Sequence, residues 1–104
     1  MIITTTEIIA DKRVSRTIGL VKGNTIQTRH IGKDIRAGLK GIVGGELGDY
    51  TEMLASARDE AIARMVEDAQ AQGANAIIGM RLATSMVMQS ASEVVAYGTA
   101  VVLE

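Results

Sequence analysis

Few side chains in this sequence are of types that commonly perform chemistry, and they are scattered along the chain. His30 is the only histidine, and none of the 104 residues is a cysteine. A lone histidine cannot form a multi-histidine metal site or a charge-relayed pair without groups from elsewhere. The simplest interpretation of His30 is a surface or hydrogen-bonding residue, although a ring of subunits would bring several copies around one axis.

Three acidic residues, Glu46, Asp49 and Glu52, follow one another at spacings of three. Metal sites with oxygen ligands do cluster carboxylates. Acids also favour the first turn of a helix, where they complement the helix dipole. We prefer the dipole interpretation. As the alternative, we keep His30, Glu46, Asp49 and Glu52 as candidate ligands of a divalent metal shared between subunits.

Charged residues on otherwise apolar segments form a second group of candidates. Arg58 falls about 40° from Leu54 around a helix, in the middle of an apolar stripe, and Asp68 falls near the stripe's other edge. Arg81 is the only charged residue between Asn75 and Ser92. Such charges must be paired or must reach a polar cavity. They predict structural or interface ion pairs, with an anion site as the functional alternative.

Two further patterns have simple structural explanations. Met86 and Met88 carry thioethers, which suit Cu(I), but methionines in a chain with few aromatics more simply fill the core and interfaces. Gly44, Gly45 and Gly48 lack the Gly-Lys-Ser/Thr or G-x-G-x-x-G context of a nucleotide site. We interpret the segment from 44 to 49 as a flexible connector.

No set of nucleophile and base emerges from these residues, so the sequence predicts a protein without catalysis. Lys and Arg number 11 against 12 Asp and Glu, and the only aromatic residues are Tyr50 and Tyr97. This balance argues against nucleic-acid binding, which uses basic faces with aromatic platforms. Charged residues interrupt every apolar stretch before about 18 residues, so we expect no membrane span. Without a secretory signal pattern, the cytoplasm is the default location.

The apolar content is high for a chain that fits a single domain over residues 1–104. Hydrophobic residues make up 47% of the sequence and charged residues 22%. A chain this short has much surface for its volume and should be more polar if it is monomeric. We therefore expect a homo-oligomer, in which a second copy covers part of the apolar surface.

The patterns predict an α+β domain with two layers. Residues 1–6 are typical of an edge strand, and residues 17–28 of one long bent strand, with a hairpin at 22–24 as the alternative. A short helix with regularly spaced glycines is expected at 32–43, suited to close approach of another backbone. A long amphipathic helix is expected at about 51–72, followed by Gly73 as a left-handed C-cap.

Two strands, at 75–85 and 94–103, should complete an antiparallel sheet. The last strand alternates an Ala/Gly side with a Val/Tyr/Leu side and has no strongly polar face, so both of its faces should be covered. The Ala/Gly side suits a helix packed closely on it. The other side then needs the second helix or a neighbouring subunit.

Several segments together resemble one known family. They are MIITTT at the N-terminus, IVGG, SAR within the long helix, GANAIIGMR after it, and YGTAVVL near the C-terminus. In this order they resemble the YbjQ-like family, labelled a "putative heavy-metal-binding" domain. The resemblance implies a dodecin-like β-α-β-β subunit with extra short strands, assembled into pentameric rings that sometimes pair as decamers. It identifies no catalytic residues, and without Trp or Phe we expect no flavin of the kind that dodecins stack.

Overall fold

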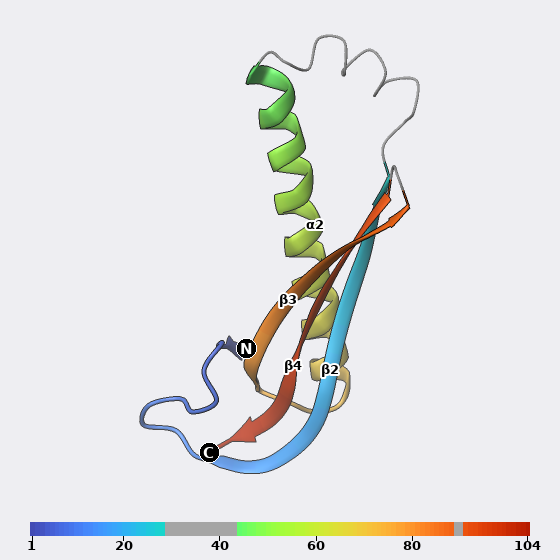
Figure 1. Ribbon diagram of the computed structural model, residues 1–104. Coiled ribbons are helices and arrows are strands. Elements are labelled where there is room, and N and C mark those ends of the chain that lie inside the picture. Colours follow the sequence, from blue (N-terminus) through green and yellow to red (C-terminus); the bar gives the residue numbers. More distant parts are fainter. Residues whose placement is uncertain (29–43, 89–90) are drawn as a thin grey trace.

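The computed structural model describes residues 1–28, 44–88 and 91–104, which form one long helix packed on a four-stranded sheet (Figure 1). The elements are β1 (Ile2–Ile3), β2 (Val14–Thr28), α2 (Gly44–Ala71), β3 (Ala76–Met88) and β4 (Ala91–Leu103). The strand order is β1-β3-β4-β2. This arrangement confirms the α+β class. The glycine-spaced helix expected at 32–43 lies outside the described residues.

The sheet is mixed rather than wholly antiparallel. The long strands β3, β4 and β2 are antiparallel neighbours, as expected. β1 lies at the edge, also as expected, but it pairs parallel with β3 through Ile2 and Ile3. A parallel neighbour needs a long connection. Here β2 and α2 lie between the two strands in sequence.

β2 is one long strand, which confirms that interpretation over the hairpin. Its pairing with β4 runs from Val14 to Thr28, with shifts in register on either side of Thr17. Gly19 has a φ of 132°, a backbone conformation that side chains rarely adopt. The bend of the strand is therefore placed at this glycine.

The helix α2 begins earlier than the sequence patterns indicated. The interpretation of residues 44–49 as a flexible connector is wrong, because α2 starts at Gly44 and is 28 residues long. The glycines each lower helix propensity by about 1 kcal/mol, yet Glu46 and Asp49 fall in the first two turns, where acids complement the dipole. The predicted end is confirmed: the helix stops at Ala71, and Gly73 has a φ of 89°.

The core lies between α2 and the strands β2 and β4. Small residues on both layers let the backbones approach closely, and Met65 is among the largest side chains with no exposed surface. Thr25 of β2 is buried, and its hydroxyl donates to the Ala57 carbonyl of α2 at 3.0 Å. The buried core cluster consists of Val21, Ala57, Ala61, Met65, Ala69, Ile77, Val94, Ala96 and Ala100.

The two faces of β4 differ as its alternation predicted. Val94, Ala96, Gly98 and Ala100 are buried on the side of α2. On the opposite face Tyr97 keeps 39% of its surface exposed. Val101 on the same face is fully buried, so described residues cover this face near Val101 and leave it more open at Tyr97.

Candidate functional site

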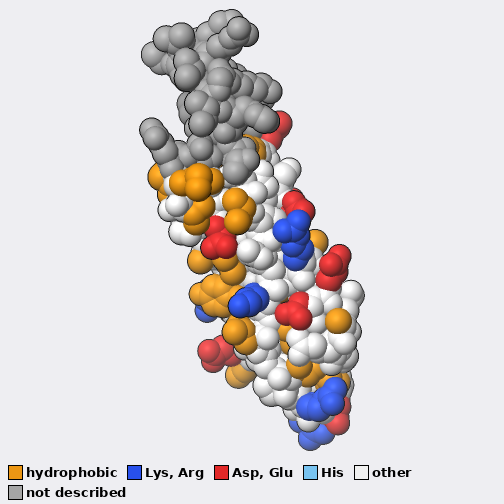
Figure 2. All heavy atoms as spheres, turned by 90° about the vertical axis from the view of Figure 1, so that its right-hand side faces the viewer, with side chains coloured by type: hydrophobic (Ala, Val, Ile, Leu, Met, Phe, Trp, Pro, Cys, Tyr) orange, Lys and Arg blue, Asp and Glu red, His pale blue; other side chains and the backbone are white. Residues whose placement is uncertain are grey.

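The outer half of β3 is the most unusual surface of the described chain. Ala76 and Ile77 are buried, but every residue from Arg81 to Met88 is exposed. Four of them are large and apolar: Leu82, Met86, Val87 and Met88, with exposures of 41%, 74%, 50% and 63%. Figure 2 shows apolar side chains gathered at this end of the molecule, beside the residues drawn in grey. We call the segment from Leu82 to Met88 the open edge.

The N-terminal segment explains where the open edge begins. After β1 its backbone continues along β3, with bonds from Thr4 N–H to the Ile77 carbonyl at 2.9 Å and from Met80 N–H to the Thr4 carbonyl at 3.0 Å. Arg81 then donates through Nη1 to the Thr5 carbonyl at 2.8 Å. Beyond Arg81, β4 is the only described strand paired with β3. The other side of the open edge therefore presents unpaired backbone groups.

The helix does not cover the open edge, because α2 lies over β2 and β4. Arg64 donates to the Asn24 carbonyl at 2.6 Å, and the helix backbone lies directly against Gly23. The register places Leu82, Thr84 and Met86 on the same side of the sheet as α2, opposite Ala96, Val94 and Ser92. These three side chains of β3 nevertheless remain exposed. The open edge is thus bare on both faces.

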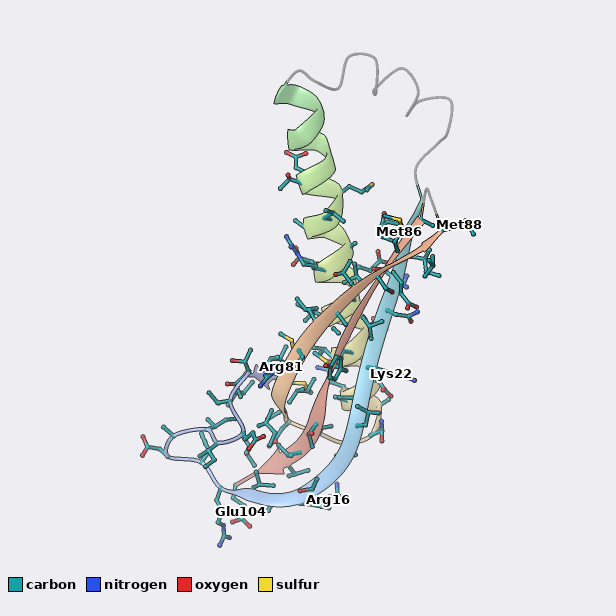
Figure 3. The ribbon with its side chains drawn as sticks, viewed as in Figure 1. Arg16, Lys22, Arg81, Met86, Met88 and Glu104 are labelled. Carbon is teal, nitrogen blue, oxygen red and sulfur yellow. The ribbon has the colours of Figure 1, made fainter. Side chains whose placement is uncertain are left out.

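The face of the sheet away from the helix carries a transverse row of three polar residues. The register aligns Lys22 of β2, Tyr97 of β4 and Arg81 of β3. Figure 3 shows Arg81 beside the N-terminal segment and Lys22 on the far side of β4. Arg81 donates hydrogen bonds to the Thr5 and Met80 carbonyls. Its side chain therefore links the N-terminal segment to β3.

Arg58, which the sequence placed on the apolar stripe, is exposed and makes no hydrogen bond or ion pair with a described residue. It lies about 80° around the helix from Asp68 and about 120° from Arg64. Those two residues contact the backbone of β2. Arg58 therefore does not share the side of α2 that contacts the backbone of β2. A pairing partner within the described part of its own subunit is absent, so the interface pair stays a prediction.

Asp68 has a structural role. Its side chain accepts from the Lys22 backbone N–H at 3.4 Å and from Gln72 Nε2 at 3.0 Å. These bonds fix the last turns of α2 against β2. Asp68 is therefore satisfied within the subunit, and the structure does not bring it near Arg58.

A model of the YbjQ family, described as "Putative heavy-metal-binding", matches residues 1–104. The chain belongs to this family. A UPF0145 protein of Dehalococcoides mccartyi is 61% identical over 104 residues and covers 100% of both chains. One from Clostridioides difficile is 59% identical, covering 100% of this chain and 93% of the relative. These relatives carry no assigned activity in their names.

A solved structure supports the fold of this YbjQ family member. It is a protein of unknown function of the DUF74 family from Pediococcus pentosaceus, with a TM-score of 0.71 and 22% identity, covering 100% of this chain and 98% of that one. At this identity the likeness extends to the fold alone.

Across residues 1–28, 44–88 and 91–104, no helical segment is apolar over a length that would span a bilayer.

Most of the candidate metal ligands lie outside the residues whose side chains the structure describes. His30 lies among residues 29–43, and nothing is described of the Glu46 and Asp49 side chains. Glu52 is exposed on α2. The described residues contain no group of three or more His, Cys, Asp or Glu side chains that could hold a metal ion.

The two methionines that suggested a soft metal lie on the open edge. A register shift separates Met86 from Met88, and both are more than half exposed. Met86 and Met88 stood out in the sequence by their thioethers, whereas their neighbours Leu82, Thr84 and Val87 did not. One feature of the sequence could have pointed to them: no residue from Leu82 to Ser92 is charged. A strand with one face in water normally carries charged residues on that face.

Proposed function

We propose that this protein is a non-catalytic homo-oligomer, a pentameric ring or a decamer of two rings, in which residues 1–104 form one domain. The observation that carries the proposal is the open edge, which is apolar and bare on both faces and along one side. An exposed, long and apolar edge strand is a template for pairing with another chain. Native monomers shorten such edges or protect them with charge, proline or a bulge. Leu82–Met88 has no charge and no proline, and its only irregularity is the register shift between Met86 and Met88.

The dimensions of the subunit support the same proposal. Its radius of gyration is 17.3 Å, whereas a compact domain of this length has a radius of about 13 Å. An elongated chain buries less of its own apolar surface than a compact one. Contact with further copies would bury the remainder and add to the free energy of folding.

The mass of the particle in solution tests the proposal. The chain has a mass of 11.0 kDa, so a pentamer has five times that mass, about 55 kDa, and a decamer about 110 kDa. Size-exclusion chromatography with multi-angle light scattering at micromolar concentration should give one of these two masses. A single species of about 11 kDa would contradict the proposal.

The family is described as "Putative heavy-metal-binding", and the alternative for this chain is a divalent metal site shared between subunits. The described residues gather no set of three His, Cys, Asp or Glu side chains, and the sequence has no cysteine. His30 and the side chains of Glu46 and Asp49 lie outside the described part of the chain, so the shared site stays the alternative.

A further inference from the structure

The row of Lys22, Tyr97 and Arg81 crosses the sheet on the face away from α2. In the two antiparallel pairs these residues stand directly opposite each other, so their side chains lie on the same face. Neighbouring strands are about 4.8 Å apart, which places the backbones of Lys22 and Arg81 about 10 Å from each other. Figure 3 shows the two cations on either side of β4. The row therefore sets an aromatic ring between two positive charges.

No carboxylate on the three long strands neutralises these two charges. Glu93 is the only acidic residue within β2, β3 and β4. It lies four residues from Tyr97 along β4, about 13 Å away, and accepts from Asn24 Nδ2 at 3.2 Å. Neither Lys22 nor Arg81 forms an ion pair with a described residue. Both positive charges therefore remain uncompensated on this face.

The guanidinium of Arg81 is held in place on one side only. Its Nη1 donates to the Thr5 carbonyl and to the Met80 carbonyl, both at 2.8 Å, while Nε and Nη2 donate to no described residue. Glu7, two residues beyond Thr5, is exposed and makes no ion pair within the described ranges. The remaining donors of a fixed guanidinium lie in one plane, which suits the two oxygens of a carboxylate or a phosphate.

Tyr97 supplies an exposed aromatic surface between the cations. It is 39% exposed, and the side chains next to the row on the same face include Leu20, which is 69% exposed, and the half-buried Val95. An aromatic ring favours offset or edge-on contact with a second ring, and apolar neighbours add contact area. The ammonium of Lys22 on the other flank binds an anion as a point charge on a flexible stem.

We propose that the row of Lys22, Tyr97 and Arg81 binds a planar aromatic ligand that carries an anionic group on each of two opposite sides. The ring of the ligand packs on Tyr97, one anionic group accepts from the free donors of Arg81, and the other meets Lys22. A ligand with one anionic group reaches only one cation, and an aliphatic dianion has no ring to pack. This site goes beyond the proposed assembly, because it uses a face of the sheet and not its edge.

Ligand-observed NMR titration of the full chain with terephthalate tests the proposal. Terephthalate has a flat ring with a carboxylate on each of two opposite sides. Because exposed ion pairs contribute little, we expect a dissociation constant of about 0.1 to 1 mM. Benzoate, which has one carboxylate, and adipate, which has two but no ring, should each bind at least about fivefold more weakly.

Three variants assign the binding to the row. Lys22→Gln should weaken terephthalate binding at least about threefold, and Tyr97→Leu, which keeps an apolar side chain, about tenfold. The matched control is Lys12→Gln, which removes the same charge from an exposed residue outside the row and should leave the affinity unchanged.

Three results would overturn the proposal: no saturable binding of terephthalate below about 10 mM, equal affinity for terephthalate and either control ligand, or an affinity that Lys22→Gln and Tyr97→Leu leave unchanged. The particle mass is a separate measurement. A wild type of about 11 kDa that binds terephthalate as described would contradict the assembly and leave this site standing.

Discussion

Replacing Gly23 by alanine is expected to lower the free energy of unfolding by about 3 kcal/mol or more, because there is no room for a side chain at this position. An added Cβ would meet the backbone of Ala61 and Met65 and would lie 2.7 Å from Arg64 Cβ. Backbone atoms of a helix cannot swing aside as a flexible side chain can. The whole helix would have to move away from β2, which would loosen the core.

Urea denaturation at a fixed subunit concentration measures this effect, since unfolding of an oligomer depends on concentration. Gly19→Ala is the matched control. Its Cβ would meet no atom within 4 Å, but its φ of 132° is unfavourable for alanine. It should cost about 1 to 2 kcal/mol, from backbone strain alone. If Gly19→Ala and Gly23→Ala lowered the free energy of unfolding equally, close packing of α2 on β2 would not be the reason for the glycine at position 23.

Shortening Met65 to alanine should cost about 2 to 5 kcal/mol, the usual range for emptying a buried site of this size. Met65 has no exposed surface and lies in the core cluster between α2 and the sheet. The neighbouring core residues on α2 are alanines, so no long side chain is available there to fill the cavity. Thermal unfolding followed by circular dichroism should show a clearly lower midpoint.

Gln70→Ala is the control on the same helix, because Gln70 is exposed. It should change the unfolding free energy by no more than about 0.5 kcal/mol. A Met65→Ala protein as stable as the Gln70→Ala protein would contradict the description of the core between α2, β2 and β4.

The sequence patterns predicted the parts of the fold that depend on periodicity. The stripe of Ala57, Ala61, Met65 and Ala69 gave the helix and its buried side, and Gly73 gave its end. The alternation in β4 predicted which side the helix covers. Periodicity carries this information because burial on one side imposes it directly on the residue types.

Features that depend on tertiary contacts were not accessible in the same way. The start of α2 was missed because local propensity disfavours Gly44 and Gly45 in a helix, and the folded context overrides it. Arg58 is a charged residue on an apolar stripe of the sequence. Whether its side chain is buried depends on how far α2 is displaced across the sheet toward β2. That offset arises from the contact at Gly23 and cannot be read from a helical wheel.

Hydrogen–deuterium exchange of the open edge tests whether a strand of another copy pairs with it in the assembled protein. In a lone subunit, about half of the amides from Leu82 to Met88 point away from β4 and have no strand partner. In the assembled protein we predict that nearly all of these amides exchange slowly, because a strand of another copy pairs with them. Fast exchange of half of these amides in the wild-type particle would contradict the account, because the open edge would then be unpaired.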